Sequence, residues 1–178
     1  MPELLPFTDS EEANRLLASD PMALLIGFAL DQQVPVQKAF SGPYVLRERL
    51  GTLDPKALAE ADLEPIFREK PAIHRFPGSM AKRVQELAEH IRDRWDGDAA
   101  RIWNEAKDAD ELRANLEALP GFGEMKIASL MTVLDKRFGI KAARGVRFDM
   151  PTMGDIDSPE KLAEYQDKKK AWKQKRGA

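Results

Sequence analysis

Residues 119–126 read Leu-Pro-Gly-Phe-Gly-Glu-Met-Lys, and they interrupt a long helical pattern. Apolar residues recur at helical spacing before this stretch, and they recur after it at positions 127, 130, 131, 134 and 138. The pattern predicts two helices joined by a tight turn, together spanning residues 112–138. The glycines at positions 121 and 123 permit positive φ angles and leave one surface without Cβ atoms. Free N–H groups at the start of the second helix can then approach an external anion.

An ordinary pair of antiparallel helices, in which the glycines only permit the turn, accounts for Pro-Gly-Phe-Gly equally well. Two further segments bear on the choice. Residues 25–36 form an apolar helical run that ends in Gln-Gln-Val-Pro-Val, and residues 76–83 read Phe-Pro-Gly-Ser-Met-Ala-Lys-Arg. Because positions 22–30 are apolar on every side, they predict a buried central helix, from which polar residues 31–33 emerge at the end.

Taken in this order, the three segments resemble those of the helix-hairpin-helix superfamily of base-excision DNA glycosylases. The resemblance covers residues 20–140 and is nearest to a small cysteine-free bacterial branch, which also reads Pro-Gly-Phe-Gly and ends in a lysine-rich helix. It implies an all-α fold in which two helical lobes surround a DNA-binding cleft, with the hairpin at its edge. Double-stranded DNA with a damaged base is the partner that the resemblance implies.

Composition agrees with a small globular protein, and one domain over residues 1–178 is expected. The formal net charge of -2 does not indicate a nucleic-acid partner, so any DNA affinity must come from local basic patches. With no cysteine, disulfides and thiolate-bound iron–sulfur clusters are excluded. His74 and His90 are too few for a dedicated zinc site, so we expect neither a metal nor another cofactor. No signal peptide or membrane span is visible, and we expect a cytoplasmic, nucleoid-associated monomer.

The resemblance also implies which residues contact DNA. The hairpin would grip the DNA backbone, residues at the end of the central helix would enter the minor groove near the flipped base, and the start of the helix after position 76 would face phosphates. The residues concerned are Gly121, Phe122, Gly123, Met125 and Lys126 in the hairpin, Gln32 and Gln33 after the central helix, and Ser79 and Lys82, with Arg83 beside them. Alternatively, the glutamines cap the preceding helix, and Ser79 and Lys82 belong to a solvated basic turn with Ser79 as N-cap.

Cleavage of a glycosidic bond passes through a cation on the sugar, so it requires a carboxylate close to C1′. In the superfamily this acid lies shortly after the second helix of the hairpin, but residues 140–145 contain none. The next carboxylates are Asp149, Asp155 and Asp157. Asp157 already has a use as a helix cap, so Asp149 and Asp155 are the candidate catalytic residues.

Relatives that also cleave the DNA strand carry a Schiff-base lysine where this chain has Met125. Lys126 lies one residue further on, which turns its side chain by about 100° around the helix. We therefore expect a phosphate contact from Lys126 and no lyase chemistry. The expected function is monofunctional removal of a damaged, for example alkylated, base. A non-catalytic DNA-binding protein that lost the acid is the alternative, and a helical interaction module without DNA affinity is a third interpretation.

Several local expectations concern the rest of the chain. The helix after Pro35 is expected to be interrupted or reoriented around residues 41–43 and then to continue to residue 50, and Gly51 is expected to cap its end. His74 is expected to be a packed or capping residue. Residues 141–154 show no clear period and predict a long loop. Asp157 or Ser158 should cap a final basic helix over residues 158–178, which is rich in lysine.

Overall fold

The computed structural model describes residues 2–177, in which every regular element is a helix, as expected for the all-α class. Residues 1 and 178, at the ends of the expected domain, lie outside the described residues. Along the chain the helices are α1 (Glu11–Ser19), α2 (Pro21–Leu30), α3 (Val36–Leu50), α4 (Pro55–Glu60), α5 (Glu64–Arg68), α6 (Pro77–Trp95), α7 (Arg101–Asn104), α8 (Ala109–Glu117), α9 (Glu124–Lys136), the 3-10 helices η1 (Lys141–Ala143) and η2 (Met153–Asp155), and α10 (Pro159–Gly177). No helix in this part of the chain combines the length and the apolar composition needed to cross a bilayer.

The central helix is α2, and it is buried as expected. Asp20 begins it by accepting a hydrogen bond from the Met22 N–H at 2.9 Å, and Pro21 occupies the first helical position. Every residue from Met22 to Leu30 is buried. Only glycine fits at position 27, because the Phe40 ring of α3 occupies the space where a Cβ atom would lie. This close approach brings α2 and α3 into tight contact.

Of the two alternatives expected around residues 41–43, an interruption or a reorientation of the helix, the structure excludes the interruption. Helix α3 continues through Pro43 to Leu50, and Gly51, at φ +94°, caps its end as expected. Proline removes a backbone donor and normally bends or breaks a helix. At the preceding residue, Gly42, α3 approaches α2 so closely that an added Cβ atom would collide with the Leu30 side chain.

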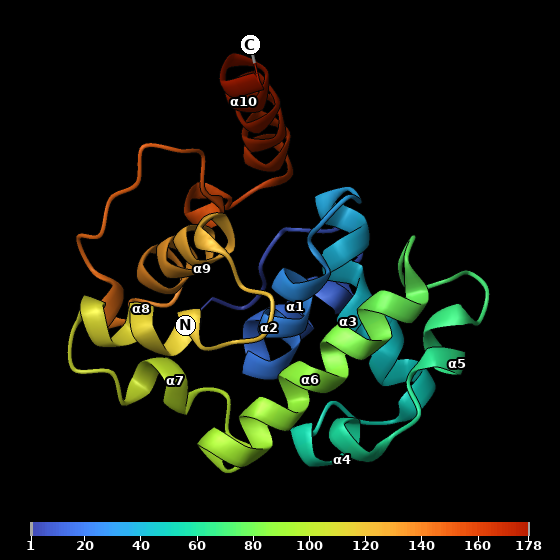
Figure 1. The fold of residues 1–178 in the computed structure, drawn as a ribbon. Coiled ribbons are helices and arrows are strands. Elements are labelled where there is room, and N and C mark those ends of the chain that lie inside the picture. Colours follow the sequence, from blue (N-terminus) through green and yellow to red (C-terminus); the bar gives the residue numbers. More distant parts are fainter. Residues whose placement is uncertain (1, 178) are drawn as a thin grey trace.

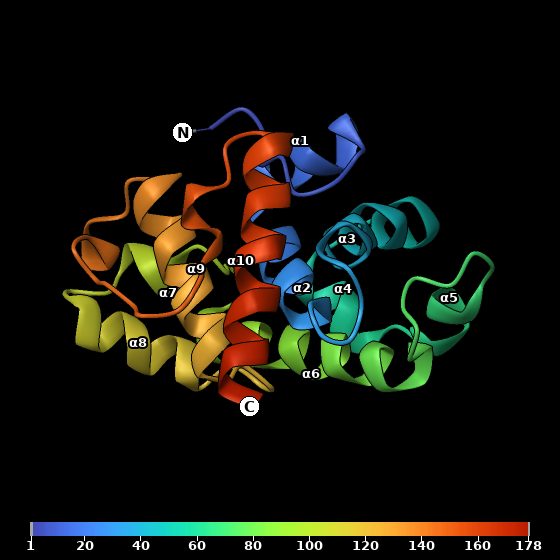
Figure 2. The same ribbon diagram turned by 90° about the horizontal axis from the view of Figure 1, so that it is seen from above.

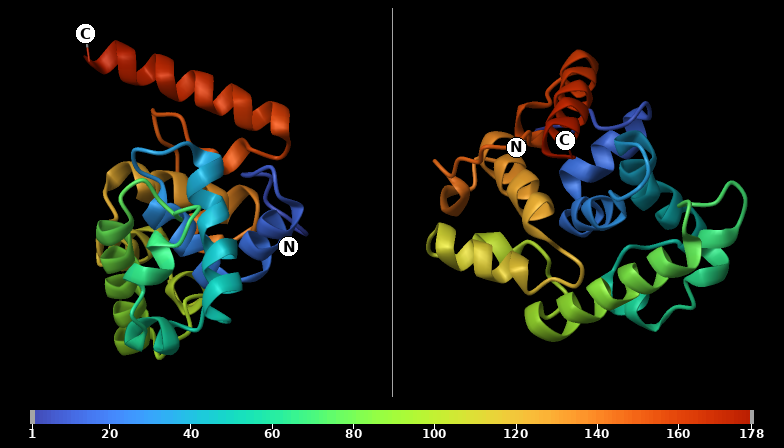
Figure 3. Two further views of the ribbon diagram at one scale, coloured as in Figure 1. Left: turned by 90° about the vertical axis from the view of Figure 1, so that its right-hand side faces the viewer. Right: turned by 45° about the horizontal axis from the view of Figure 1, so that its top comes forward.

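The helices pack in two groups. The first group is α1–α6, centred on α2 and bounded on one side by α6, and the second group is α7–α9 with η1 and η2 (Figure 1). The buried hydrophobic side chains of both groups form one continuous cluster. Helix α10 belongs to neither group: it lies across the face between α9 and the helices α2 and α3, as two perpendicular views show (Figures 2 and 3).

Two other expectations about helix ends are refined. Helix α6 begins at Pro77, so Ser79 lies in its first turn and is not its N-cap. Proline is well suited to the first helical position, where its missing N–H would have no partner. At the start of α10, the cap is Ser158, whose hydroxyl accepts the Lys161 N–H at 3.2 Å. The expected long loop after α9 contains the short helices η1 and η2, and η2 packs on α9.

Candidate functional site

The turn between α8 and α9 presents an open backbone surface. Gly123 is the N-cap of α9 with φ −91° and ψ 179°, and a Cβ atom added there would meet no atom within 4 Å. Among residues 2–177, no group accepts a hydrogen bond from the N–H of Glu124 or Met125, while the Ile127 N–H bonds to the Gly123 carbonyl at 3.0 Å. Free N–H groups at the positive end of a helix dipole are suited to an anion.

Arg83 of α6 lies against the other glycine of this turn. Gly121 has φ +76°, and a Cβ atom there would collide with the Arg83 guanidinium group. The glycine is therefore needed twice, for its left-handed conformation and for the room it leaves to the arginine. The sequence placed Lys82, which is exposed, and Arg83 in the same expected contact segment, and only the tertiary contact distinguishes these neighbours.

The end of α2 is held by His74. Its Nε2 lies 3.0 Å from the Leu30 carbonyl oxygen and 3.2 Å from that of Gln32, while its Nδ1 accepts the Phe76 N–H at 3.0 Å. These bonds place the proton on Nε2. Burial lowers the pKa of His74, although the two carbonyl hydrogen bonds oppose this effect. The histidine is thus a packed, capping residue, as expected from the sequence.

The two glutamines after α2 differ in their surroundings. The Gln32 amide nitrogen lies 3.4 Å from the Ala29 carbonyl oxygen and 3.4 Å from Met80 Sδ of α6, so this side chain caps α2 and contacts the first turns of α6. Gln33 is exposed and has φ +59°. A left-handed conformation costs an ordinary residue about 1 kcal/mol, and such residues are frequent at functional sites. Of the two, Gln33 is free to contact a ligand.

Lys126 links the start of α9 to the end of α2. Its Nζ donates a hydrogen bond to the Asp31 carbonyl oxygen at 3.4 Å. Burial lowers the pKa of the Lys126 ammonium, the charge of Asp31 opposes this, and Arg83 and Lys169 act in the same direction as burial. Burial also raises the pKa of the Asp31 carboxyl, against the effects of Lys169, Lys126 and Lys173. Charged groups from α2, α6, α9 and α10 therefore meet at one place.

Three of the expected contact segments are brought together by these interactions. Gln32 contacts Met80, Arg83 packs on Gly121, and Lys126 bonds to Asp31. We call the meeting place of residues 31–33, 79–83 and 121–126 the junction. Within it Ser79 and Lys82 are exposed, Met125 is half-buried, and the Phe122 ring is buried in the core, so only the backbone of Phe122 is available to a ligand.

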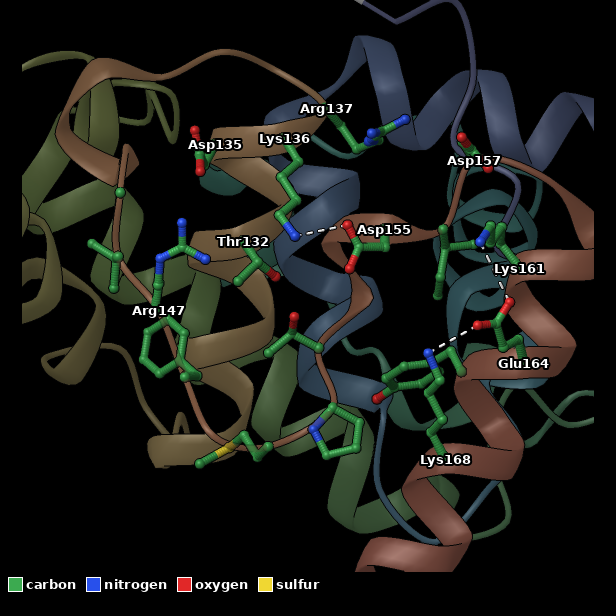
Figure 4. Close-up of a pocket in the computed structure, with 18 residues that line it drawn as sticks. Thr132, Asp135, Lys136, Arg137, Arg147, Asp155, Asp157, Lys161, Glu164 and Lys168 are labelled. Carbon is green, nitrogen blue, oxygen red and sulfur yellow. Dashed lines mark hydrogen bonds and ion pairs between the residues drawn. The ribbon is translucent and has the colours of Figure 1, made fainter.

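Of the two carboxylates expected from the loop, Asp155 lies away from the turn. Asp155 pairs with Lys136 at 2.7 Å, and Lys136 is the last residue of α9, at the end opposite the turn. A helix of this length rises roughly 18 Å, so the two ends are well separated. Asp155 lines a pocket of about 780 Å³ between α9, residues 145–157 and α10, where Glu164 also pairs with Lys161 and Lys168 (Figure 4). Asp149 is exposed and does not line this pocket.

Comparisons with protein-family models, with curated proteins and with solved structures found no match for this chain.

Proposed function

We propose that this protein binds duplex DNA through the turn between α8 and α9 and removes a damaged base, for example an alkylated one, by hydrolysis. In this proposal the two groups of helices are the lobes of a helix-hairpin-helix glycosylase, DNA enters between them, and the protein acts at the bacterial nucleoid. The observation that supports it is the junction. Three segments that resemble DNA-contacting parts of that superfamily are far apart in sequence, yet they adjoin one another.

The residues of the junction suit different parts of this task. The free N–H groups after Gly123 can bind a phosphate, and Arg83 and Lys126 add positive charge beside it. Contacts of this kind hold DNA in register without reading its sequence. Gln33, exposed on a left-handed turn, is available to enter the duplex where a base is extruded.

A non-catalytic protein that recognises damaged DNA is the second candidate. It is favoured by the absence of an acid in residues 140–145 and by the ion pair that already engages Asp155 far from the turn. Both candidates require the same DNA-binding surface. They differ only in whether a carboxylate acts on the sugar.

Base release from defined duplexes tests the proposal. Duplexes that each carry one damaged base, including alkylated purines, are incubated with the protein, and abasic sites are then counted by alkaline cleavage. We expect release from at least one alkylated duplex and none from the undamaged duplex. Binding of damaged duplexes without any release would establish the second candidate, and the absence of any DNA binding would refute both.

A further inference from the structure

Asp31 carries a partly buried carboxylate without a close partner. Its carbonyl oxygen accepts the Lys126 hydrogen bond, but no hydrogen bond or ion pair within 4 Å engages its carboxylate oxygens among residues 2–177. Three cations act on the carboxylate from further away: Lys126 of α9, and Lys169 and Lys173 of α10. The buried Tyr165 phenol is also close enough to feel its charge. The surroundings are thus positive, but no group neutralises this acid directly.

Other carboxylates of the chain have evident structural uses. Asp20, at the opposite end of α2, caps that helix through the Met22 N–H. Asp155 pairs with Lys136, and Asp108 caps α8 by accepting the Glu111 N–H at 2.9 Å. Asp31 ends α2 and has no comparable use for its side chain. Partly buried, unpaired carboxylates cost folding free energy, and they concentrate at functional sites.

The position of Asp31 relative to the turn suggests what it faces. Lys126 lies in the first turn of α9, three residues after Gly123, and it contacts Asp31. A phosphate on the free N–H groups of α9 would therefore bring the neighbouring nucleotides close to Asp31. The lysines around this acid can hold phosphates on either side of it.

We propose that Asp31, and not a carboxylate of the loop after α9, faces C1′ of the extruded nucleotide. This inference rests on the function proposed above. When the bond between C1′ and the base nitrogen breaks, its electron pair leaves with the base, and the Asp31 carboxylate stabilises the positive sugar. A water oxygen then bonds to C1′, and its proton passes to Asp31 and from there to solvent. A base that is cationic through alkylation leaves as a neutral molecule, whereas a neutral base leaves as an anion and takes up a proton from solvent.

Binding of a cationic sugar analogue tests the placement without requiring turnover. The probes are two duplexes, one with a pyrrolidine abasic analogue, whose ring nitrogen is positively charged, and one with the neutral tetrahydrofuran analogue. We expect the native protein to bind the pyrrolidine duplex about tenfold more tightly or better, because an opposite charge within a few ångströms is strongly attractive. Asp31→Asn should abolish this preference, and the matched controls Asp149→Asn and Asp155→Asn should keep it.

The outcomes separate the inference from the proposed function. A preference that survives Asp31→Asn, that a control variant abolishes, or that the native protein never shows would overturn the placement of Asp31, even if bases are released. Loss of the preference in Asp31→Asn alone supports the placement, whether or not the native protein releases a base. Where release occurs, Asp31→Asn should lower its rate at least a hundredfold, and the two controls should not. A native protein that binds no duplex would overturn both proposals.

Discussion

At the scale of single residues, the ionisation of Asp31 works against folding. Burial raises the pKa of its carboxyl above the value of about 3.9 that is ordinary for aspartate. A raised pKa in the folded state means that the charged form is disfavoured there, so stability is lost as the pH rises above the ordinary value. We therefore expect Asp31→Asn to raise the midpoint of thermal unfolding, Tm, at pH 7. The gain should shrink as the pH falls and vanish well below about 3.9, where the native carboxyl is protonated in both states.

Thermal scans of the native protein and of Asp31→Asn at several pH values provide this measurement. The difference between the two proteins isolates Asp31, because every other titratable group is common to both. Asp155→Asn is the matched control and should show no such gain, since its carboxylate is exposed and paired with Lys136. A lower Tm for Asp31→Asn at pH 7 would mean that the charge of Asp31 holds the junction together.

Lys126 bears on the type of chemistry. Burial lowers the pKa of its ammonium group, which leaves a larger neutral fraction than an exposed lysine has. Its Nζ nevertheless contacts the Asp31 carbonyl, and the position of the lyase lysine is held by Met125. We expect no covalent adduct when the protein and an abasic duplex are treated with borohydride. An adduct that Lys126→Ala removes would show instead that Lys126 is a nucleophile.

At the scale of elements, the turn between α8 and α9 offers a clean test of DNA binding. Gly123→Val would place a side chain where a phosphate has to lie, and φ −91° is acceptable to valine. We expect an affinity loss for duplexes of about tenfold, since a hydrogen bond to a charged group contributes roughly 1.5–3 kcal/mol and tenfold corresponds to roughly 1.4 kcal/mol. The loss of stability should stay near 1 kcal/mol. Fluorescence anisotropy with a labelled duplex measures the affinity.

Asn104→Val is the control for this test, because Asn104 of α7 is uncharged, exposed and outside the junction. Gly121 is unsuitable, since a side chain there would be strained and would displace Arg83. Affinity of the native protein should also fall steeply with salt and depend little on sequence, as expected for phosphate contacts. Equal affinities of the folded Gly123→Val variant and the native protein would remove the turn from the interface.

At the scale of the whole molecule, α10 lies across the face that the proposed DNA would approach (Figure 2). Its own residues Leu162 and Tyr165 are buried, and its Gln166 exchanges hydrogen bonds with Gln37 of α3, the shorter at 2.9 Å. Its lysines 169 and 173 are close enough to Asp31 to affect its pKa. A nucleotide that reaches Asp31 must therefore displace the second half of α10. DNA phosphates can then pair with the lysines of this helix.

A reversible crosslink tests this displacement, and the absence of cysteine makes it specific. Gln37→Cys and Gln166→Cys are combined and joined by a short bis-maleimide with a cleavable disulfide. We expect the crosslinked protein to bind duplexes at least tenfold more weakly and to recover when a reductant cleaves the linker. Each single variant, treated with the same reagent, serves as control. If the crosslinked protein binds DNA with full affinity, α10 does not cover the DNA-binding surface.

The sequence by itself determined most of the helices of this protein and the turn between α8 and α9. Asp20-Pro21 marks the start of α2, Gly51 ends α3, and the glycines of residues 121–123 mark the turn, because caps and turns depend on neighbours a few residues away. The proximity of the three junction segments agrees with what the family resemblance implied. Their role in DNA binding stays a prediction.

Only the tertiary structure decided the features that join distant residues. Helix α3 continues through Pro43 and approaches Leu30 closely at Gly42. Arg83 rather than Lys82 meets the turn because it lies on the side of α6 that faces Gly121. The positive surroundings of the Asp31 carboxylate come from Lys126, which is 95 residues away in the sequence, and from Lys169 and Lys173 of α10. The reason is that the burial of a group, and the charges that act on it, come from every element packed around it. The periodicity of residues along the chain carries no information about those neighbours.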